Sequence, residues 1–409
     1  MIPSMTPQAK PANLALITSA QVLALSLWFS GTAAGPGMLR AALSPIPGFQ
    51  AWLTSSVQAG FVVGTLLSAV LSLPDRVDPR GLLAAASLAG AAVNALILLL
   101  PVGGPADIFA RFLTGVALAG VYPVGMKLAA GWADRADTGL VVGLLVGGLT
   151  LGSAAPHLVN AFGGLDWRVT LVSASAAAVL GAALILMVRL GPRHATAARF
   201  DPAAALLLWR DRGTRLVTLG YLGHMWELYA MWAWIGAYLT ASFAAHRAGD
   251  AAPGGAALAT FAVIGVGSVG CVAAGLAADR VGRVEVTSIA LAISGLCCLL
   301  AGPLFGAHPA ITVALCLVWG VAVVADSAQF SASVAELARP GLTGTMLTLQ
   351  TCLGFALTLV SIHLTPVLMA RAGWGATFTV LAIGPALGIV AMQRLGRSAA
   401  GRPLAGVRR

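Results

Sequence analysis

Residues 275–283 read Gly-Leu-Ala-Ala-Asp-Arg-Val-Gly-Arg, a short charged loop between two long apolar stretches. Near the start of the chain, residues 73–77 read Leu-Pro-Asp-Arg-Val and occupy the same place between two other apolar stretches. They match Ala-Ala-Asp-Arg-Val at residues 277–281. A weaker match at a similar offset aligns Phe-Leu-Thr-Gly at 112–115 with Leu-Val-Trp-Gly at 317–320. This spacing predicts a parallel repeat, in which two halves of the chain share one fold.

The rest of the sequence is too apolar for a protein dissolved in water. It is 58% hydrophobic and 9% charged, whereas about 25% of the residues in a soluble domain are charged. A helix needs about 20 apolar residues to cross a membrane, so the sequence predicts an all-α membrane protein with twelve transmembrane helices. The predicted spans are residues 14–37, 50–73, 81–101, 106–131, 138–162, 168–190, 214–243, 256–278, 285–305, 309–335, 342–367 and 373–393.

The longest polar break separates the first six spans from the last six. We therefore expect an N-terminal six-helix half over 1–190, a cytoplasmic central loop over 191–213, and a C-terminal six-helix half over 214–409 with a short cytoplasmic tail. Most Lys and Arg residues fall in loops that this count places on one side, and the positive-inside rule makes that side cytoplasmic, together with both termini. Glycine pairs such as Gly60/Gly64 and Gly148/Gly152 predict close helix packing.

Composition also argues against several partners and activities. The formal net charge is +10, but the positive residues lie between spans rather than in a basic run interleaved with aromatic residues. The lipid bilayer is therefore the expected partner, and nucleic acid is not. The five cysteines lie in apolar spans without metal-ligand spacing, so we expect no metal and no cofactor. ATP-binding and hydrolase motifs are missing from the sequence, which argues against an enzyme.

A few ionisable side chains lie inside the predicted spans: Arg111 in span 4, His224 and Glu227 in span 7, and Asp326 in span 10. Such residues cost about 2.5–3.5 kcal/mol each on insertion scales, so they are usually functional or paired. Burial favours a neutral carboxyl and a nearby cation favours a charged one, which is the balance that a reversible proton carrier needs. We predict proton coupling by Glu227, Asp326 and His224. The alternative is a purely structural pair between Glu227 and His224.

Other polar and aromatic residues in spans 1, 4, 7 and 10 are candidates for a substrate cavity. At about 100° per residue, His224, Glu227 and Trp234 share one helical face, as do Trp319, Asp326 and Gln329. Two roles stay open for Arg111: proton relay or anion binding, and a structural ion pair near the outer surface. The predicted cavity residues are Arg111, Tyr122, Tyr221, Trp234, Trp319, Gln329, Gln21 and Trp28.

The loop at 275–283 resembles the G-x-x-x-D-R-x-G-R-R signature of the major facilitator superfamily. The first-half copy is degenerate, with Leu71 and Asp78 where the pattern has glycine. Arg111 and Gly115 are similar to an R-x-x-x-G pattern that many members carry in span 4. The resemblance implies two pseudo-symmetric six-helix halves, with spans 1, 4, 7 and 10 lining a central cavity. It also implies a cytoplasmic gating role for Asp75, Arg76, Arg80, Asp279, Arg280, Gly282 and Arg283.

Together these features predict a secondary transporter of the plasma (inner) membrane, functional as a monomer. We expect it to move a small organic solute by alternating access, coupled to protons, with symport and antiport both open. The alternative within transport is an uptake carrier for an organic or inorganic anion anchored by Arg111. A membrane sensor or scaffold without transport, and an intramembrane enzyme using Glu227, His224 and Asp326, are the remote alternatives.

Overall fold

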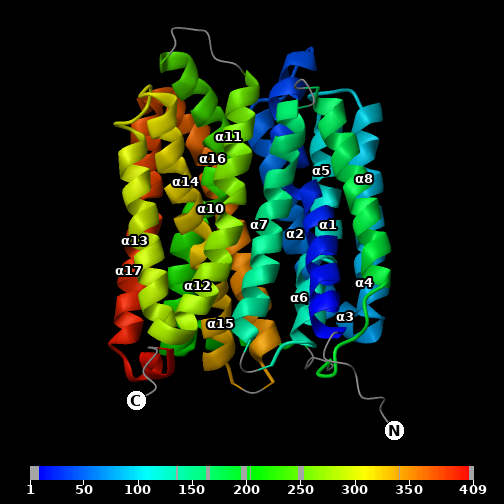
Figure 1. Ribbon diagram of the computed structural model, residues 1–409, viewed down its shortest axis with the longest axis vertical. Helices are drawn as coiled ribbons and strands as arrows, with labels where there is room; N and C mark the ends of the chain where they lie inside the picture. Colours follow the sequence, from blue (N-terminus) through cyan, green and yellow to red (C-terminus); the bar gives the residue numbers. More distant parts are fainter. Residues whose placement is uncertain are drawn as a thin grey trace.

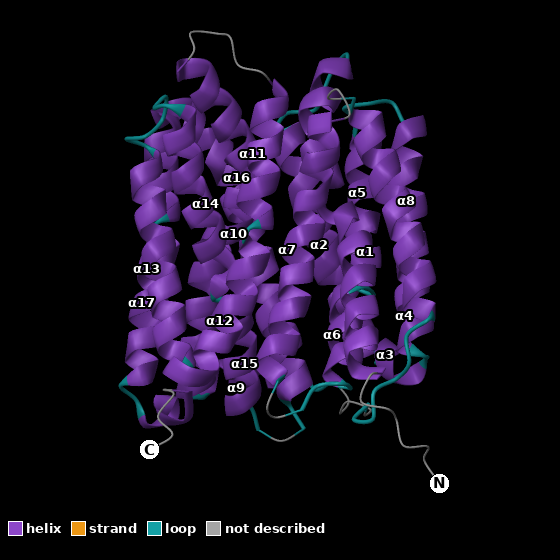
Figure 2. Cartoon of the chain, in the orientation of Figure 1, coloured by secondary structure: helices purple, strands orange, loops and turns teal. Residues whose placement is uncertain are grey.

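The computed structural model describes residues 9–134, 137–162, 166–194, 200–202, 204–246, 253–339 and 341–404. All regular structure in these ranges is helical, as Figure 2 shows. The first half of the chain forms α1 (Ala9–Ala41), α2 (Phe49–Val70), α3 (Leu73–Arg76), α4 (Pro79–Leu96), η1 (Ile97–Leu99), α5 (Pro105–Leu118), α6 (Tyr122–Ala130), α7 (Thr138–Phe162) and α8 (Trp167–Leu186).

The predicted central loop, residues 191–213, contains a short helix that precedes the second half of the chain. Residues 195–199 and 203 of this loop lie outside the described ranges. The helices from this loop onward are α9 (Ala204–Arg210), α10 (Arg212–His246), α11 (Pro253–Gly265), α12 (Gly267–Val281), α13 (Arg283–Ala301), α14 (Pro309–Ala325), α15 (Ser327–Leu337), α16 (Thr343–Leu381), α17 (Ile383–Gly396) and η2 (Ala399–Leu404).

Ten helical stretches in the described part of the chain are long and apolar enough to cross a membrane. The protein is therefore a multi-pass membrane protein, as predicted. One of the ten, Thr343–Gly396, has 54 residues and would be about 80 Å long as a straight helix, far more than the roughly 30 Å of hydrocarbon. It is interrupted at Gly373, whose φ of 75° favours glycine. α10 has 35 residues but is not among the ten, so the count of twelve stays a prediction.

Four of the predicted spans are built from two helices each. Span 4 is α5 followed by α6, span 8 is α11 followed by α12, span 10 is α14 followed by α15, and span 12 is the part of α16 after Gly373 followed by α17. In span 10 the two helices meet at Asp326, which is the C-cap of α14 and the N-cap of α15. A candidate functional carboxyl therefore sits where the regular backbone hydrogen bonding of its span is interrupted.

The helices of each half of the chain pack mainly among themselves. In Figure 1 those of the first half, blue to sea green, lie on one side, and most of those of the second half, green to red, lie on the other. α7 contacts α11 and α12, and α2 contacts α16, so these helices connect the two groups. The start of α1 and the end of the described chain at η2 lie at the same end of the bundle. We call this the inner end, and the opposite end the outer end.

Glycines set the distance between several helices. A Cβ on Gly64 of α2 would lie 2.7 Å from the backbone oxygen of Val116 in α5, and one on Gly152 of α7 would lie 2.6 Å from that of Val22 in α1. No side chain larger than hydrogen fits at these separations without a shift of backbone. The close packing predicted from the glycine pairs is confirmed at these two positions.

Candidate functional site

A small cavity, called here the central cavity, lies between the two groups of helices near mid-height. α6 and α7 line it from the first half of the chain, and α10, α14, α15 and α16 line it from the second. Its walls include five aromatic side chains, those of Tyr122, Tyr221, Tyr229, Trp232 and Phe355. The volume is about 50 Å³, whereas pockets for organic ligands are usually about 300–1,000 Å³. The bundle is therefore closed at its centre in this conformation.

A larger cavity of about 340 Å³, called here the outer cavity, opens between the two groups toward the outer end. α1, α7, α10 and α11 line it, together with Gln50 of α2. Its polar lining includes Arg40, Gln50 and His157. Nε2 of His157 and Oε1 of Gln50 have no hydrogen-bond partner within the described ranges. Both atoms are buried, so two residues that line the outer cavity hold polar atoms without a described partner.

Glu227 lies inside the second half of the bundle and turns away from both cavities. Its Oε1 accepts hydrogen bonds from Ser294 Oγ at 2.6 Å, Trp319 Nε1 at 2.6 Å and Cys298 Sγ at 3.1 Å. The side chain is 1% exposed, and no ion pair to Glu227 occurs within the described ranges. A buried carboxyl held only by neutral donors is compatible with either protonation state, because no cation fixes the charge.

His224 and Asp326 form a second buried pair. His224 Nδ1 lies 2.9 Å from Asp326 Oδ1, and both side chains are 1% exposed. Neither oxygen of Asp326 has a hydrogen bond of normal geometry, and Nε2 of His224 has no partner among the residues that the structure describes. A proton on the imidazole would make an ion pair, and a proton on the carboxyl would make a neutral contact, so the pair can hold one proton in two ways.

Arg111 is fully buried and saturated by neutral acceptors from three other helices. Its Nη1 and Nη2 both donate to the backbone oxygen of Leu27, each at 3.1 Å. Nη1 also donates to Asn94 Oδ1 at 2.9 Å, and Nη2 also donates to the backbone oxygen of Trp28 at 2.5 Å. Nε donates to the backbone oxygen of Leu53 at 3.3 Å. Every guanidinium nitrogen is engaged, so Arg111 ties α1, α2 and α4 to α5.

The other predicted cavity residues are dispersed. Tyr122 and Tyr221 line the central cavity, and Trp234 lines the outer cavity while donating to the backbone oxygen of Ile362 at 3.0 Å. Gln21 Nε2 donates to the backbone oxygen of Tyr122 at 3.0 Å, and Trp28 packs against Phe61, Tyr229 and Phe355. Trp319 holds Glu227 and Gln329 accepts from Arg283. None of Glu227, His224 and Asp326 lines the central cavity.

At the inner end, the signature loop contacts both halves of the chain. Asp279, at the end of α12, lies beside the first turn of α7. The two are so close that a Cβ added to Gly139 of α7 would lie 2.6 Å from Oδ2 of Asp279. A carboxylate at a helix N-terminus is stabilised by about 0.3–1 kcal/mol. Arg283 Nη1 donates to Gln329 Oε1 at 2.8 Å, and its Nη2 pairs with Glu336 Oε1 at 2.6 Å. Gly282 between them has a φ of 108°, while Arg280 is exposed.

The degenerate first-half loop is built differently. Asp75 pairs with Lys127 at 2.5 Å, and Arg76 is exposed. Asp78 replaces the signature glycine because it caps α4: its Oδ1 accepts from the backbone nitrogen of Arg80 at 2.9 Å, and its Oδ2 pairs with Nη2 of Arg80 at 2.6 Å. The hydrogen bond from the Arg80 side chain lowers the pKa of Asp78 below its usual value of 3.8. The first-half turn at Asp78 therefore does not need the positive φ that Gly282 adopts at the matching position of the second-half loop.

Sequence reasoning missed the residues that hold the candidate side chains. Ser294 and Cys298 come from α13, and Asn94 comes from α4, two helices that carried no candidate for proton coupling or for the substrate cavity. Lys127 was assigned no role, yet it binds Asp75. Isolated Ser and Asn residues in otherwise apolar spans were the available signal, because buried polar side chains need partners.

Comparisons with known proteins agree with the motif. The model of the Major Facilitator Superfamily matches residues 16–361. Among solved structures, a crystal structure of a mutant of the nucleoside transporter NupG is similar with a TM-score of 0.72 and 15% sequence identity, over 93% of this chain and 99% of that chain. At this identity the likeness shows the fold alone. A search of curated proteins finds no match.

Proposed function

The chain belongs to the major facilitator superfamily and is a secondary transporter, and we propose that it couples the movement of a small organic solute to protons. Under this proposal Glu227 is the principal proton-binding group, and the His224–Asp326 pair is the second. The two halves of the chain would move relative to each other and expose the central cavity alternately to each side of the membrane. The proposal keeps the plasma (inner) membrane, cytoplasmic termini and a monomeric unit as expected from the sequence.

The observation that carries the proposal is the environment of Glu227. Three neutral donors and, in the part of the chain that the structure describes, no paired cation surround a fully buried carboxyl. A group that served only to stabilise the fold would be expected to pair with a basic residue or to be replaced by an apolar one, since an isolated buried charge is expensive. A carboxyl that releases its proton only when the bundle opens needs this kind of site.

The closed inner end supports alternating access. Asp279 connects α12 of the second half to α7 of the first half, and Arg283 fixes α13 to α15. The larger cavity between the halves lies toward the outer end. We therefore propose that this conformation is closed toward the cytoplasm, and that breaking the Asp279 contact with the start of α7 permits the opposite opening.

The lining of the central cavity suggests the class of solute. Five aromatic side chains, two methionines and a few hydroxyl groups surround it, and none of the described residues that line it is charged. Such walls favour a flat, largely apolar organic molecule with few polar groups, because aromatic faces contribute contact area and stacking. Nucleosides, which the similar solved structure is named for, are one class to include in a screen.

Anion uptake anchored by Arg111 receives less support. All guanidinium nitrogens of Arg111 already donate to protein acceptors, and the side chain is 0% exposed. An anion would have to displace several of these bonds at once, at about 1–3 kcal/mol for each buried group left unpaired. The geometry favours Arg111 as a clamp between helices.

The test has two steps. A thermal-shift screen of the purified protein across solutes identifies ligands, since a ligand that binds the native state raises the melting temperature. Proteoliposomes are then loaded with a pH-sensitive dye, and each stabilising solute is added outside. Solute-dependent proton movement is the expected result. Uptake of a solute without any proton movement, insensitive to an imposed pH gradient, would exclude proton coupling while leaving transport intact.

A further inference from the structure

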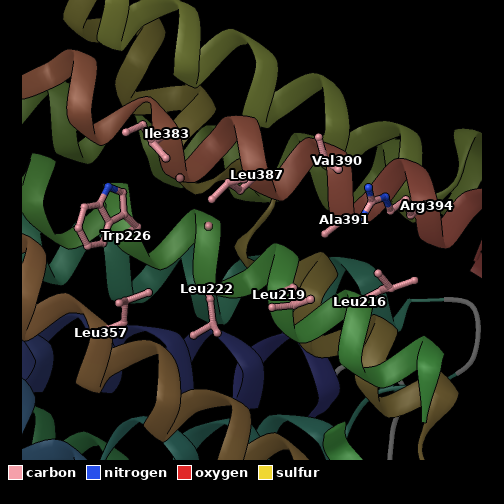
Figure 3. Close-up of a pocket in the computed structure, with 12 residues that line it drawn as sticks. Leu216, Leu219, Leu222, Trp226, Leu357, Ile383, Leu387, Val390, Ala391 and Arg394 are labelled. Atoms are coloured by element: carbon pink, nitrogen blue, oxygen red, sulfur yellow. The ribbon is translucent and has the colours of Figure 1, made fainter. Parts of the chain in front are cut away.

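A long apolar groove runs along the outside of the second half of the chain, between α10 and α17 (Figure 3). Its volume is about 480 Å³, and Leu357 of α16 closes it from the side. The groove faces outward, because Leu219, Ile383 and Leu387 on its walls are 41%, 53% and 63% exposed. In a membrane-spanning bundle, side chains exposed on this surface face lipid.

The length of the groove corresponds to one leaflet of a bilayer. Along α10 it extends from Leu216 to Trp226, which is about 15 Å at 1.5 Å per residue, and the hydrocarbon core of a bilayer is about 30 Å thick. A transmembrane helix of a partner would need a groove along the whole thickness. An extended acyl chain from one leaflet needs only half of it.

Among the described residues that line the groove, Arg394 is the only charged one, and it lies at the inner end (Figure 3). Arg394 is exposed and makes no hydrogen bond or ion pair within the described ranges. At the other end, Gly384 and Gly223 bring the backbones of α17 and α10 into contact, and Trp226 forms a wall. The groove therefore has an apolar body, a closed deep end and a cation where the headgroups of the inner leaflet lie.

We propose that this groove binds one acyl chain of an anionic glycerophospholipid from the inner leaflet, with the headgroup phosphate at Arg394. The apolar walls alone do not select a lipid, because the bilayer is as apolar as the groove. Selection for the anionic headgroup comes from Arg394, and a basic residue near an anionic membrane surface contributes about 1 kcal/mol, or about fivefold in affinity.

The lipid site adds to the proposed transport function, and it concerns the same helix. Gly223 and Trp226 of α10 line the groove, and they alternate along the helix with His224 and Glu227, which face the interior. A chain seated in the groove packs against the backbone that carries both candidate proton-binding groups. Bound lipid is therefore expected to stabilise the contact between α10 and α17.

Trp226 provides the readout, because it lies at the deep end of the groove. The protein is reconstituted in nanodiscs of phosphatidylcholine that contain a brominated-chain lipid, either phosphatidylglycerol or phosphatidylcholine. Bromine quenches nearby tryptophan, and the Trp226→Phe variant supplies the contribution of the other nine tryptophans for subtraction. We expect Trp226 to be quenched at about fivefold lower amounts of the brominated phosphatidylglycerol.

Matched variants separate the charge from the groove. Arg394→Gln should remove the preference for phosphatidylglycerol, whereas Arg210→Gln should keep it, because Arg210 is an exposed arginine of α9 at the same end of the bundle (Figure 2). Ala391→Phe fills the groove and should prevent quenching by both lipids, while Ala386→Phe on the exposed side of α17 should not. Equal quenching by the two lipids in the native protein, or an unchanged preference in Arg394→Gln, would overturn the proposal.

If the Trp226→Phe variant does not fold, native mass spectrometry supplies the second measurement. The wild-type protein and Arg394→Gln are released from mixed-lipid nanodiscs, and the number of retained phosphatidylglycerol molecules is counted. One fewer in the variant supports the site, and equal numbers contradict it. Neither readout depends on transport, so a failure of proton coupling leaves this result interpretable.

Discussion

Replacing Glu227 with glutamine tests the proposed proton site most directly. Three donors converge on Oε1, from Ser294, Trp319 and Cys298. Alanine would leave them without an acceptor, at about 1–3 kcal/mol for each buried donor. We expect such a variant to be lost at the folding step. Glutamine keeps an oxygen in that place and removes only the ability to ionise, so we expect a stability change of about 1–2 kcal/mol.

The expected functional result is a loss of coupling rather than of binding. In proteoliposomes with an imposed pH gradient, Glu227→Gln should no longer accumulate solute above its outside concentration. Exchange of labelled for unlabelled solute at equal concentrations should continue, because exchange needs the conformational change but no net proton transfer. Glu285→Gln is the matched control, since it changes an exposed carboxyl in the first turn of α13, the helix that also carries Ser294 and Cys298. The control should retain accumulation.

Undiminished accumulation by Glu227→Gln would refute the assignment of the proton to this residue. Loss of both accumulation and exchange, with normal expression and melting temperature, would also contradict the reasoning. It would mean that Glu227 contributes to solute binding or to the conformational change instead. Ser294→Ala removes one donor while keeping the carboxyl, so it is expected to retain coupling and to shift its pH dependence.

Asp326→Asn, with the imidazole of His224 left in place, should flatten the pH dependence of transport; an unchanged profile would assign Asp326 a structural role. Gly282→Ala places a Cβ at φ 108°, which should cost on the order of 1–3 kcal/mol and lower the melting temperature, whereas Gly344→Ala, with open space around it, is the control. Asp78→Asn should destabilise by less than about 1 kcal/mol at neutral pH because the pair with Arg80 is exposed. Since the pKa of Asp78 is lowered in the folded protein, this difference should be present above the unfolded value near 3.8 and vanish as the pH falls through the folded one. Arg111→Lys cannot reproduce the guanidinium bonds to three helices and should lower stability by on the order of 3 kcal/mol; normal stability with lost uptake would instead favour anion binding.

The sequence alone was sufficient for the helical class, the membrane environment and the family, because these depend on local properties. In lipid, the backbone of each apolar stretch must form its hydrogen bonds within that stretch. An apolar stretch long enough to cross the bilayer therefore predicts a helix, whatever it packs against. The loop containing Asp279 and Arg283 is contiguous, and its spacing is read directly. Helical periodicity also put His224 and Glu227 toward the interior, and the structure buries both.

Only the tertiary structure decided which side chains meet. The partners of Glu227 lie 67, 71 and 92 residues away in the chain, and no periodicity within one helix encodes such contacts. The same holds for Arg111, whose acceptors come from three other helices, and for the groove between α10 and α17. Helix identity is determined by neighbours in sequence, whereas the angle and register at which helices pack are set by the side chains of both partners together. For that reason a buried carboxyl can be predicted from the sequence, but its surroundings cannot.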